Sequence, residues 1–298
     1  MRQGLGKLTI VALLGTVGLA ACSQLAPFIG HLSVKPVAPG AYWVSGGISN
    51  SGFVIGDKGV IAIDAQTFVR NGKAELALIA KLTPKPVTTV ILTHSDPDHI
   101  NGLPAFPRGV TVIAQDNAKA EIARVIADPK SNGLKPSPEI RDYLPTHTVR
   151  DTEALTLDGV PMVLIHTAPA HTDGDLIVYL PKQRLVYAGD LLTPAVGPYP
   201  GIHLNKHGSS AGWITAVEAM LKLDATLFVS GHGDPLNRAQ VQARLEAAKQ
   251  HRAQIVDLVA QGKSLADIKT ALNDKRLPGV AGRFPTFVET TYQELTAR

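Results

Sequence analysis

Residues 93–99, with the sequence Thr-His-Ser-Asp-Pro-Asp-His, place four side chains that can bind a metal within six positions: His94, Asp96, Asp98 and His99. They directly follow the apolar, β-branched run 87–92, which predicts a buried strand. Because Pro97 cannot lie in a helix interior, we expect the cluster on a loop at the carboxyl end of that strand, where α/β folds carry their chemistry. A simple polar turn would not need two histidines around two carboxylates.

The spacing His-x-Asp-x-Asp-His resembles the His-x-His-x-Asp-His signature of the metallo-β-lactamase-fold hydrolases, with Asp96 where the family usually has its second histidine. The resemblance implies a lone histidine, a bridging aspartate and a final histidine, in that order along the chain. The chain supplies each of them after a run that predicts a buried strand: His171, Asp190 and His232. Short motifs such as Gly189-Asp190 and Gly231-His232 are common at turns when taken singly. The order and position of the three residues support the resemblance.

The resemblance implies two metal sites and assigns their ligands. The first metal would bind His94, Asp96 and His171, the second would bind Asp98, His99 and His232, and Asp190 would bridge the two. Two divalent ions, expected to be zinc, would hold a hydroxide between them for the hydrolysis of an ester, thioester, lactone, amide or phosphoester bond, with Asp98 and Asp190 as catalytic residues. Asp64, at the end of the predicted strand 59–64, is expected to support the metal loop, residues 93–99, from outside the ligand sphere. A turn or capping role is the alternative.

Asp96 is the main departure from the family pattern. A carboxylate in place of an imidazole favours harder ions, so iron or manganese stays open, and Asp96→His would shift the preference towards zinc. A non-haem iron redox enzyme is therefore one alternative, although the flavodiiron branch of the fold needs a flavin domain that the remaining residues do not accommodate. A metallo-β-lactamase proper is another, although lactamases of the family generally have Cys or Ser where this chain has Asp190. A metal-bearing accessory lipoprotein without turnover is the third alternative.

The pattern of apolar runs predicts an α/β fold with mixed sheets. Strand patterns recur in two series, at 41–45, 51–55, 59–64, 87–92 and 110–114, and at 154–157, 162–166, 176–180, 185–188 and 226–230. Helical patterns at 73–82 and 117–126 alternate with the first series. The resemblance implies more, namely a four-layer αβ/βα sandwich spanning a domain at residues 36–236. Helices expected at 238–261, from Ser264 onwards and at 288–296 form a C-terminal extension, 237–298, whose role as lid, dimer surface or pocket support the sequence leaves open.

Several other residues are candidates to line the pocket. His166, at a predicted strand end, and His203 and His207, on the loop after Asp190, are expected to contact substrate or to face solvent. His147 and His251 are expected at the surface. Residues 128–146, which contain four prolines, are expected to form a surface excursion beside the pocket.

The amino terminus predicts export and lipid attachment. Arg2, Lys7 and the apolar run 8–19 are typical of a signal peptide, expected at residues 1–21. Leu19-Ala20-Ala21-Cys22 resembles the lipobox of bacterial lipoproteins, which implies a lipid on Cys22, a tether at 22–35, and a periplasmic location; Ser23 favours the outer membrane. With a net charge of +4 and no charge run, the chain is not expected to bind nucleic acid, and its partners are predicted to be a small-molecule substrate and the membrane. The oligomeric state is not predicted.

The lipobox generates a prediction for the mature protein. In a bacterial host the chain should begin at a diacylglyceryl-modified Cys22, and Cys22→Ser should release it from the membrane fraction. Mass spectrometry of the native amino terminus is the measurement. Cleavage at any other residue, or an unmodified Cys22, would contradict lipid attachment while leaving export open.

Overall fold

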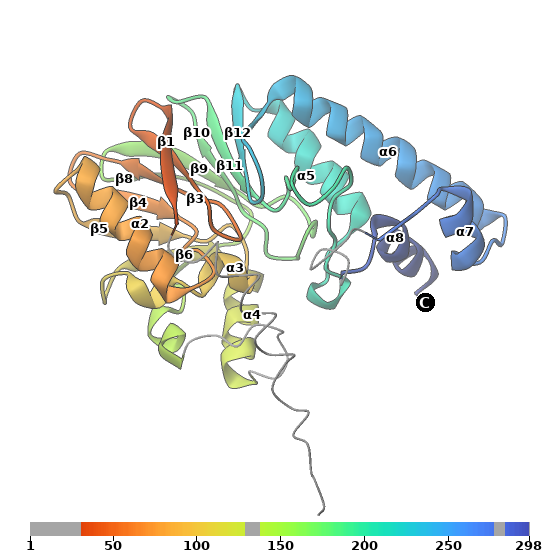
Figure 1. The fold of residues 1–298 in the computed structure, drawn as a ribbon, viewed down its shortest axis with the longest axis horizontal. Coiled ribbons are helices and arrows are strands. Elements are labelled where there is room, and N and C mark those ends of the chain that lie inside the picture. Colours follow the sequence, from red (N-terminus) through yellow and green to blue (C-terminus); the bar gives the residue numbers. More distant parts are fainter. Residues whose placement is uncertain (1–30, 129–137, 277–283, 298) are drawn as a thin grey trace, which may run out of the picture.

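The computed structural model describes residues 31–128, 138–276 and 284–297 (Figure 1). The predicted signal peptide, Cys22 and most of the predicted tether lie outside these residues, as does half of the expected proline-rich excursion. In the described ranges no helix is long and apolar enough to cross a membrane.

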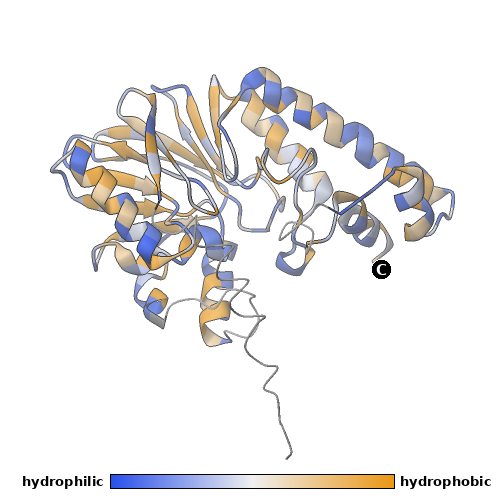
Figure 2. Ribbon diagram, in the orientation of Figure 1, coloured by the Kyte–Doolittle hydropathy of each residue, from blue (hydrophilic) through white to orange (hydrophobic). Residues whose placement is uncertain are grey.

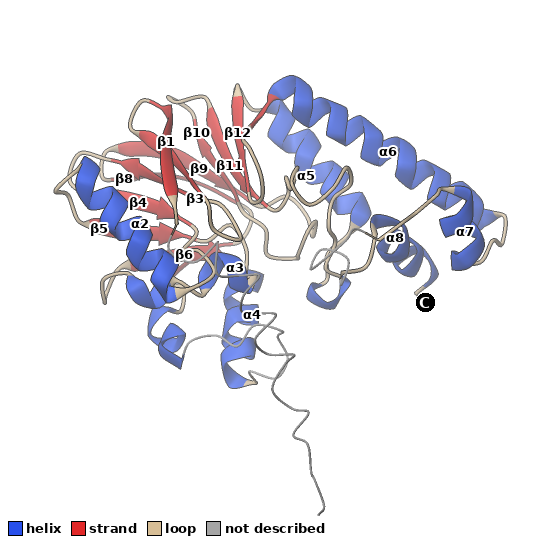
Figure 3. Ribbon diagram, viewed as in Figure 1, coloured by secondary structure: helices blue, strands red, loops and turns tan. Residues whose placement is uncertain are grey.

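The structure contains two β-sheets with helices on their outer faces (Figure 3). The first half of the chain comprises β1 (Ser33–Ala38), β2 (Ala41–Ser45), β3 (Ser51–Ile55), β4 (Val60–Ile63), α2 (Val69–Leu82), β5 (Val87–Ile91), α3 (Pro97–Ile100), η2 (Leu103–Ala105), β6 (Thr111–Gln115), α4 (Asp116–Ala127), η4 (Pro138–Tyr143) and β7 (His147–Val149). The second half comprises β8 (Thr152–Leu157), β9 (Val160–Ile165), β10 (Ile177–Leu180), β11 (Leu185–Gly189), η5 (Leu204–Lys206), α5 (Ser210–Lys222), β12 (Leu227–Ser230), β13 (Leu236–Asn237), α6 (Arg238–Ala260), α7 (Leu265–Ala271) and α8 (Phe287–Thr296).

The strand order follows the chain closely in each sheet. The first sheet has the order β1-β2-β3-β4-β5-β6-β7, antiparallel from β1 to β4 and parallel from β4 to β7. The second has the order β13-β12-β11-β10-β9-β8, antiparallel except for the parallel pair β11–β12. The prediction of an α/β fold with mixed sheets is therefore confirmed.

The central strands are apolar on both faces, which produces the layers. In β4, Val60 and Ala62 pack towards the helices of the first half, whereas Ile61 and Ile63 pack against the second sheet. The same alternation in β10 directs Ile177 and Tyr179 to the helices of the second half, because successive strand residues point to opposite faces. Figure 2 shows these strands as the most hydrophobic part of the molecule. Three apolar cores thus join four layers, helix-sheet-sheet-helix, as the family resemblance implied.

The helices after residue 237 share the core of the second sheet. Val241, Leu245 and Ile255 of α6 pack in one apolar cluster with Phe228 of β12 and Trp213 of α5. Both α6 and α7 begin with a capping box, which for α7 is formed by Ser264 and Asp267. The division of the chain at residue 236 stays a prediction.

Two local expectations differ from the structure. The strand β1 begins at Ser33, so the last residues of the predicted tether already belong to the sheet. The metal loop does not stay irregular through His99, because Pro97 occupies the first turn of α3, a position that needs no amide donor. Asp98 and His99 therefore lie on a short helix and not on the expected loop.

Glu75 of α2 is fully buried and generates a stability prediction. Ser51 Oγ donates to Glu75 Oε2 at 2.8 Å, but burial dominates and raises the pKa of Glu75 from 4.5 to about 8. The folded protein therefore holds a proton that the unfolded chain loses, so stability falls as the pH rises from about 4.5 and levels off above about 8. Glu75→Gln cannot ionise, so its free energy of unfolding should exceed that of the wild type by on the order of a few kcal/mol at pH 8, and by little at pH 5.

Thermal unfolding of both proteins across this pH range measures the effect. Glu246→Gln, at an exposed site on α6, is the matched control and should show no such pH-dependent gain. A constant difference between Glu75→Gln and the wild type at every pH would contradict a buried, protonated Glu75.

Candidate metal centre

The predicted ligands meet at one edge of the two sheets. His94 follows β5, Asp190 directly follows β11 and His232 follows β12, while His171 lies on the loop between β9 and β10. The strands β9, β11 and β12 point in the same direction, because β9 and β11 are each antiparallel to β10 and β12 is parallel to β11. Their carboxyl ends therefore bring these side chains to a single edge.

Two glycines allow the strand ends to approach each other closely. Gly189 has a φ of 54°, and a Cβ there would collide with Thr93. A Cβ at Gly231 would collide with Oδ1 of Asp190. The Gly-Asp and Gly-His pairs in the sequence thus have a steric reason, since any larger residue would push Asp190 out of position.

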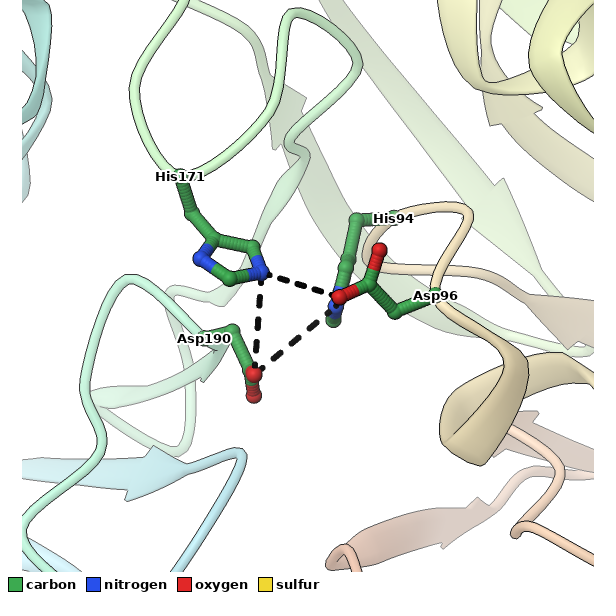
Figure 4. A group of neighbouring side chains, drawn as sticks. All are labelled: His94, Asp96, His171 and Asp190. Atoms are coloured by element: carbon green, nitrogen blue, oxygen red, sulfur yellow. Dashed lines mark hydrogen bonds and ion pairs between the residues drawn. The ribbon is translucent and has the colours of Figure 1, made fainter. Parts of the chain in front are cut away.

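The first group of potential ligands contains two histidines and two aspartates. His171 Nε2 lies 3.2 Å from Asp96 Oδ2 and 3.8 Å from Asp190 Oδ2. His94 Nε2 lies 3.8 Å from Asp96 Oδ2 and 3.9 Å from Asp190 Oδ2. Figure 4 shows the four side chains, all buried, pointing towards a common centre.

The second group contains Asp98, His99 and His232, and it also reaches Asp190. His232 Nε2 lies 3.2 Å from both Asp98 Oδ2 and Asp190 Oδ2. His99 Nε2 lies 3.7 Å from Asp98 Oδ2 and 3.2 Å from Asp190 Oδ1. Asp190 therefore lies between the two groups, where a bridging carboxylate would be.

Each of the four histidines is fixed by a contact at its Nδ1 atom. His94 Nδ1 lies 3.0 Å from Thr93 Oγ1, His171 Nδ1 lies 2.9 Å from the carbonyl of Gly201, and His232 Nδ1 lies 3.0 Å from the carbonyl of Ile48. His99 Nδ1 lies 2.8 Å from Asp64 Oδ2. Such outer partners set the tautomer and leave Nε2 with a lone pair directed into the cluster, as in histidines that bind a metal.

The residues fit divalent metal ions. Three buried polar atoms of the cluster have no hydrogen-bond partner in the structure: His94 Nε2, His99 Nε2 and Asp190 Oδ1. Leaving such atoms unpaired is costly, and a cation between them would satisfy them. Tetrahedral zinc at its usual bond lengths separates its ligand atoms by roughly 3.3 Å, close to the 3.2–3.9 Å between the ligand atoms of the first group. The buried cluster can therefore hold metal ions.

The electrostatics point to a centre that lacks positive charge. Burial opposes charge on every group, and it lowers the pKa of His94 to about 3, with His99 adding to the effect. Against burial, Asp96 raises the pKa of His171 to about 9, and Asp190 raises that of His232 to about 10. Burial likewise opposes ionisation of Asp190, yet His232 and His99 hold its pKa well below its usual range. The ionised carboxylates thus attract protons that metal ions would replace.

Asp64 supports the metal loop through three contacts. Its Oδ1 accepts from Thr93 N at 2.8 Å, and its Oδ2 accepts from Thr93 Oγ1 at 2.8 Å and faces His99 Nδ1. Asp64 has a φ of 62°, a strained conformation that directs its carboxylate to the loop after β5. One residue therefore fixes both ends of the loop 93–99.

The remaining candidate histidines lie in different surroundings. His203 is half-buried, and its Nδ1 lies 3.2 Å from Asp96 Oδ2. His166 Nδ1 lies 2.9 Å from the carbonyl of Asp175, outside both groups, and His207 is exposed at the end of η5. His147 is exposed as expected, but His251 is buried, because its ring stacks on Tyr199 at 4.1 Å; the surface expectation for His251 was wrong.

Lys206 and Phe284 are two site residues that sequence reasoning missed. Lys206 is buried, and its Nζ lies 2.6 Å from Asp96 Oδ1. Burial works against ionisation of Asp96, but His203 and Lys206 hold the pKa of this carboxyl well below its usual range. Phe284 is half exposed and stacks on His203 with ring centroids 5.8 Å apart, which places an apolar surface beside the first group. No local motif marks either residue.

The C-terminal helices hold the loop that carries His203 and Lys206. Tyr199 of this loop stacks on His251 of α6. At the other end of the loop, Ser209 Oγ and Ser210 N donate to the carboxylate of Glu294 in α8, at 2.6 and 2.9 Å. The extension therefore supports the loop beside the first ligand group, and its role as a lid or a dimer surface stays a prediction.

Comparison with known proteins identifies relatives over most of the chain. The family described as "Metallo-beta-lactamase superfamily" matches residues 44–232. The 2,4-dinitroanisole O-demethylase subunit alpha of Nocardioides sp. (strain JS1661) is 30% identical over 247 residues, which cover 80% of this chain and 70% of that subunit. The linear primary-alkylsulfatase of Pseudomonas sp. (strain ATCC 19151) is 23% identical over 274 residues, covering 76% of this chain and 50% of the sulfatase.

A solved structure shares the fold. The sec-alkylsulfatase Pisa1 from Pseudomonas sp. superposes with a TM-score of 0.67 at 19% identity, covering 89% of this chain and 50% of the sulfatase chain. The present chain thus spans about half the length of both alkylsulfatases.

The role of Asp64 generates a prediction. Asp64→Asn keeps the size and tolerates the positive φ, but it removes the charge that orients His99, so metal affinity at the second group should fall about 10- to 100-fold. Competition with a chromogenic chelator measures the change. Asp158→Asn is the matched control, since Asp158 also has a positive φ and accepts from Thr88 far from the cluster; equal affinities in the two variants would contradict the role of Asp64.

Proposed function

Because this chain belongs to the metallo-β-lactamase superfamily, we propose that its cluster is the active site of a hydrolase that uses two divalent ions, zinc in the native protein. The proposed substrate is a small ester with an apolar alkyl or aryl part. The observation that carries the proposal is the convergence of four Nε2 atoms and three carboxylates on two adjoining groups that share Asp190.

The donor set supports zinc. His94 and His171 in the first group, and His99 and His232 in the second, offer imidazole nitrogens, which suit zinc. The carboxylate of Asp96 would favour a harder ion, but its pairing with Lys206 offsets that charge. Iron or manganese is the competing proposal, and metal analysis separates the two.

The residues divide the work of hydrolysis among themselves. When bound, the two ions would supply a nucleophile at neutral pH and withdraw electrons from the bond under attack. Asp190 would hold the two metal positions at a fixed separation, since it contacts both groups. Asp98, whose Oδ2 lies 3.2 Å from His232 Nε2, would orient the second group. His203, half-buried at the side of Phe284, would contact the leaving group.

Two relatives and the side chain of Phe284 support the proposed substrate class. Relatives of this chain are named as an alkylsulfatase and as a demethylase of a nitroaromatic ether, so both names refer to substrates with apolar parts. The exposed ring of Phe284 would bind such a part. Export and the lipid anchor on Cys22 belong to the same proposal, which would place the active site in the periplasm.

Metal analysis with a substrate panel tests the proposal. Protein purified without added metal should contain two ions per chain, mainly zinc, and a chelator should abolish turnover until zinc is returned. The panel comprises 4-nitrophenyl acetate, butyrate, octanoate and sulfate, bis-4-nitrophenyl phosphate, and the β-lactam nitrocefin. Turnover of the carboxylic or sulfate esters supports the proposal, whereas turnover of nitrocefin alone, or iron in place of zinc, would contradict it.

Phe284 supplies a sharper test of the substrate class. Phe284→Ala should raise KM for the octanoate ester about five- to tenfold and leave the acetate ester nearly unchanged, because contact with the ring removes on the order of 50 Å² of apolar area from water. Leu82→Ala is the matched control, since Leu82 is the other large apolar side chain exposed in the described ranges and lies at the end of α2. An equal effect of Phe284→Ala on both esters would contradict an apolar subsite.

A further inference from the structure

Lys206 is a buried cation at the edge of the first ligand group. It ends η5, on the loop that follows Asp190, and only 6% of its side chain is exposed. Its Nζ donates to Asp96 Oδ1 at 2.6 Å, and it lies 3.4 Å from both the carbonyl and the hydroxyl oxygen of Ser95. A lysine is rarely buried in this way unless it is paired.

Asp96 is the main partner of this lysine. Glu121 Oε1 is the other acidic atom near Lys206, at 4.0 Å. That carboxylate is already engaged, because Arg124 binds both of its oxygens at 2.6 and 2.8 Å. The short contact and the direct hydrogen bond therefore belong to Asp96.

The two oxygens of Asp96 have separate surroundings. Oδ1 accepts from Lys206, whereas Oδ2 faces the imidazoles of His171 and His203 at 3.2 Å each. Only Oδ2 is thus directed at the first metal position. The ammonium group also cancels the charge of the carboxylate, so the pair is neutral, as a neutral imidazole is.

We propose that Lys206 is a positioning residue of the first metal site: it fixes Asp96 as a donor of one oxygen and cancels its charge, so that the pair takes the place of one neutral imidazole. The inference rests on the metal centre proposed above. It assigns to Lys206 a share in metal selectivity, because a carboxylate with both oxygens and its full charge free favours harder ions.

The proposal reverses the expectation for Asp96→His. A histidine at this position would leave Lys206 as an unpaired buried cation next to a divalent ion, which is strongly unfavourable. Asp96→His alone should therefore weaken zinc binding, although it adds an imidazole. Removing the cation as well, in Asp96→His/Lys206→Met, should restore a neutral site with three imidazoles.

The test compares zinc affinities of the wild type, the two single variants and the double variant, by chelator competition and elemental analysis. Asp96→His should lose at least tenfold in affinity for one of two zinc ions, and the double variant should return to within about threefold of the wild type. Lys206→Met should raise the ratio of Mn²⁺ to Zn²⁺ bound at equal concentrations about tenfold. Lys269→Met, which breaks an ion pair with Glu289 between α7 and α8, is the control and should change neither quantity.

Each outcome decides the inference. Rescue by the double variant supports it, and so does a folded, two-zinc double variant if Asp96→His alone does not fold. Wild-type affinity in Asp96→His, or a double variant no better than the single one, overturns it. A wild type with two zinc ions but no rescue contradicts only the role of Lys206, whereas a wild type that binds no metal contradicts the proposed function as well.

Discussion

The carboxylate of Asp190 is the group around which the site is arranged. It is buried and lies within 4 Å of the Nε2 atoms of His94, His99, His171 and His232. Buried carboxylates are unfavourable unless positive charge or donors surround them. The structure meets this requirement by bringing strand ends from both sheets to Asp190. This close approach is possible because Gly189 and Gly231 have no side chain. Bound metal ions would supply the remaining positive charge beside this carboxylate.

Much of the site could be predicted because each ligand follows a strand. The apolar runs before His94, Asp190 and His232 predict buried strands, and parallel strands carry their carboxyl ends to a common edge. The two mixed sheets follow from the same runs. The start of α3 at Pro97 was missed, since a proline that ends one helix can equally begin another.

Lys206 and Phe284 could not be predicted for a physical reason. Lys206 meets Asp96 across 110 residues, and the contact depends on how the loop after Asp190 returns to the metal loop. That path is set by Tyr199 against His251 and by Ser209 against Glu294, four side chains that carry no motif. The C-terminal helices thus determine which side chains surround the first ligand group. A sequence pattern made of the ligands alone contains no information on these side chains.

Crystals of the zinc-loaded protein would test the central claim most directly, through anomalous difference density measured at the zinc edge. The account predicts two peaks about 3.5–4 Å apart on either side of Asp190. One peak should lie against His94, Asp96 and His171, and the other against Asp98, His99 and His232. A single peak, or two peaks of which neither contacts Asp190, would contradict a shared dinuclear centre.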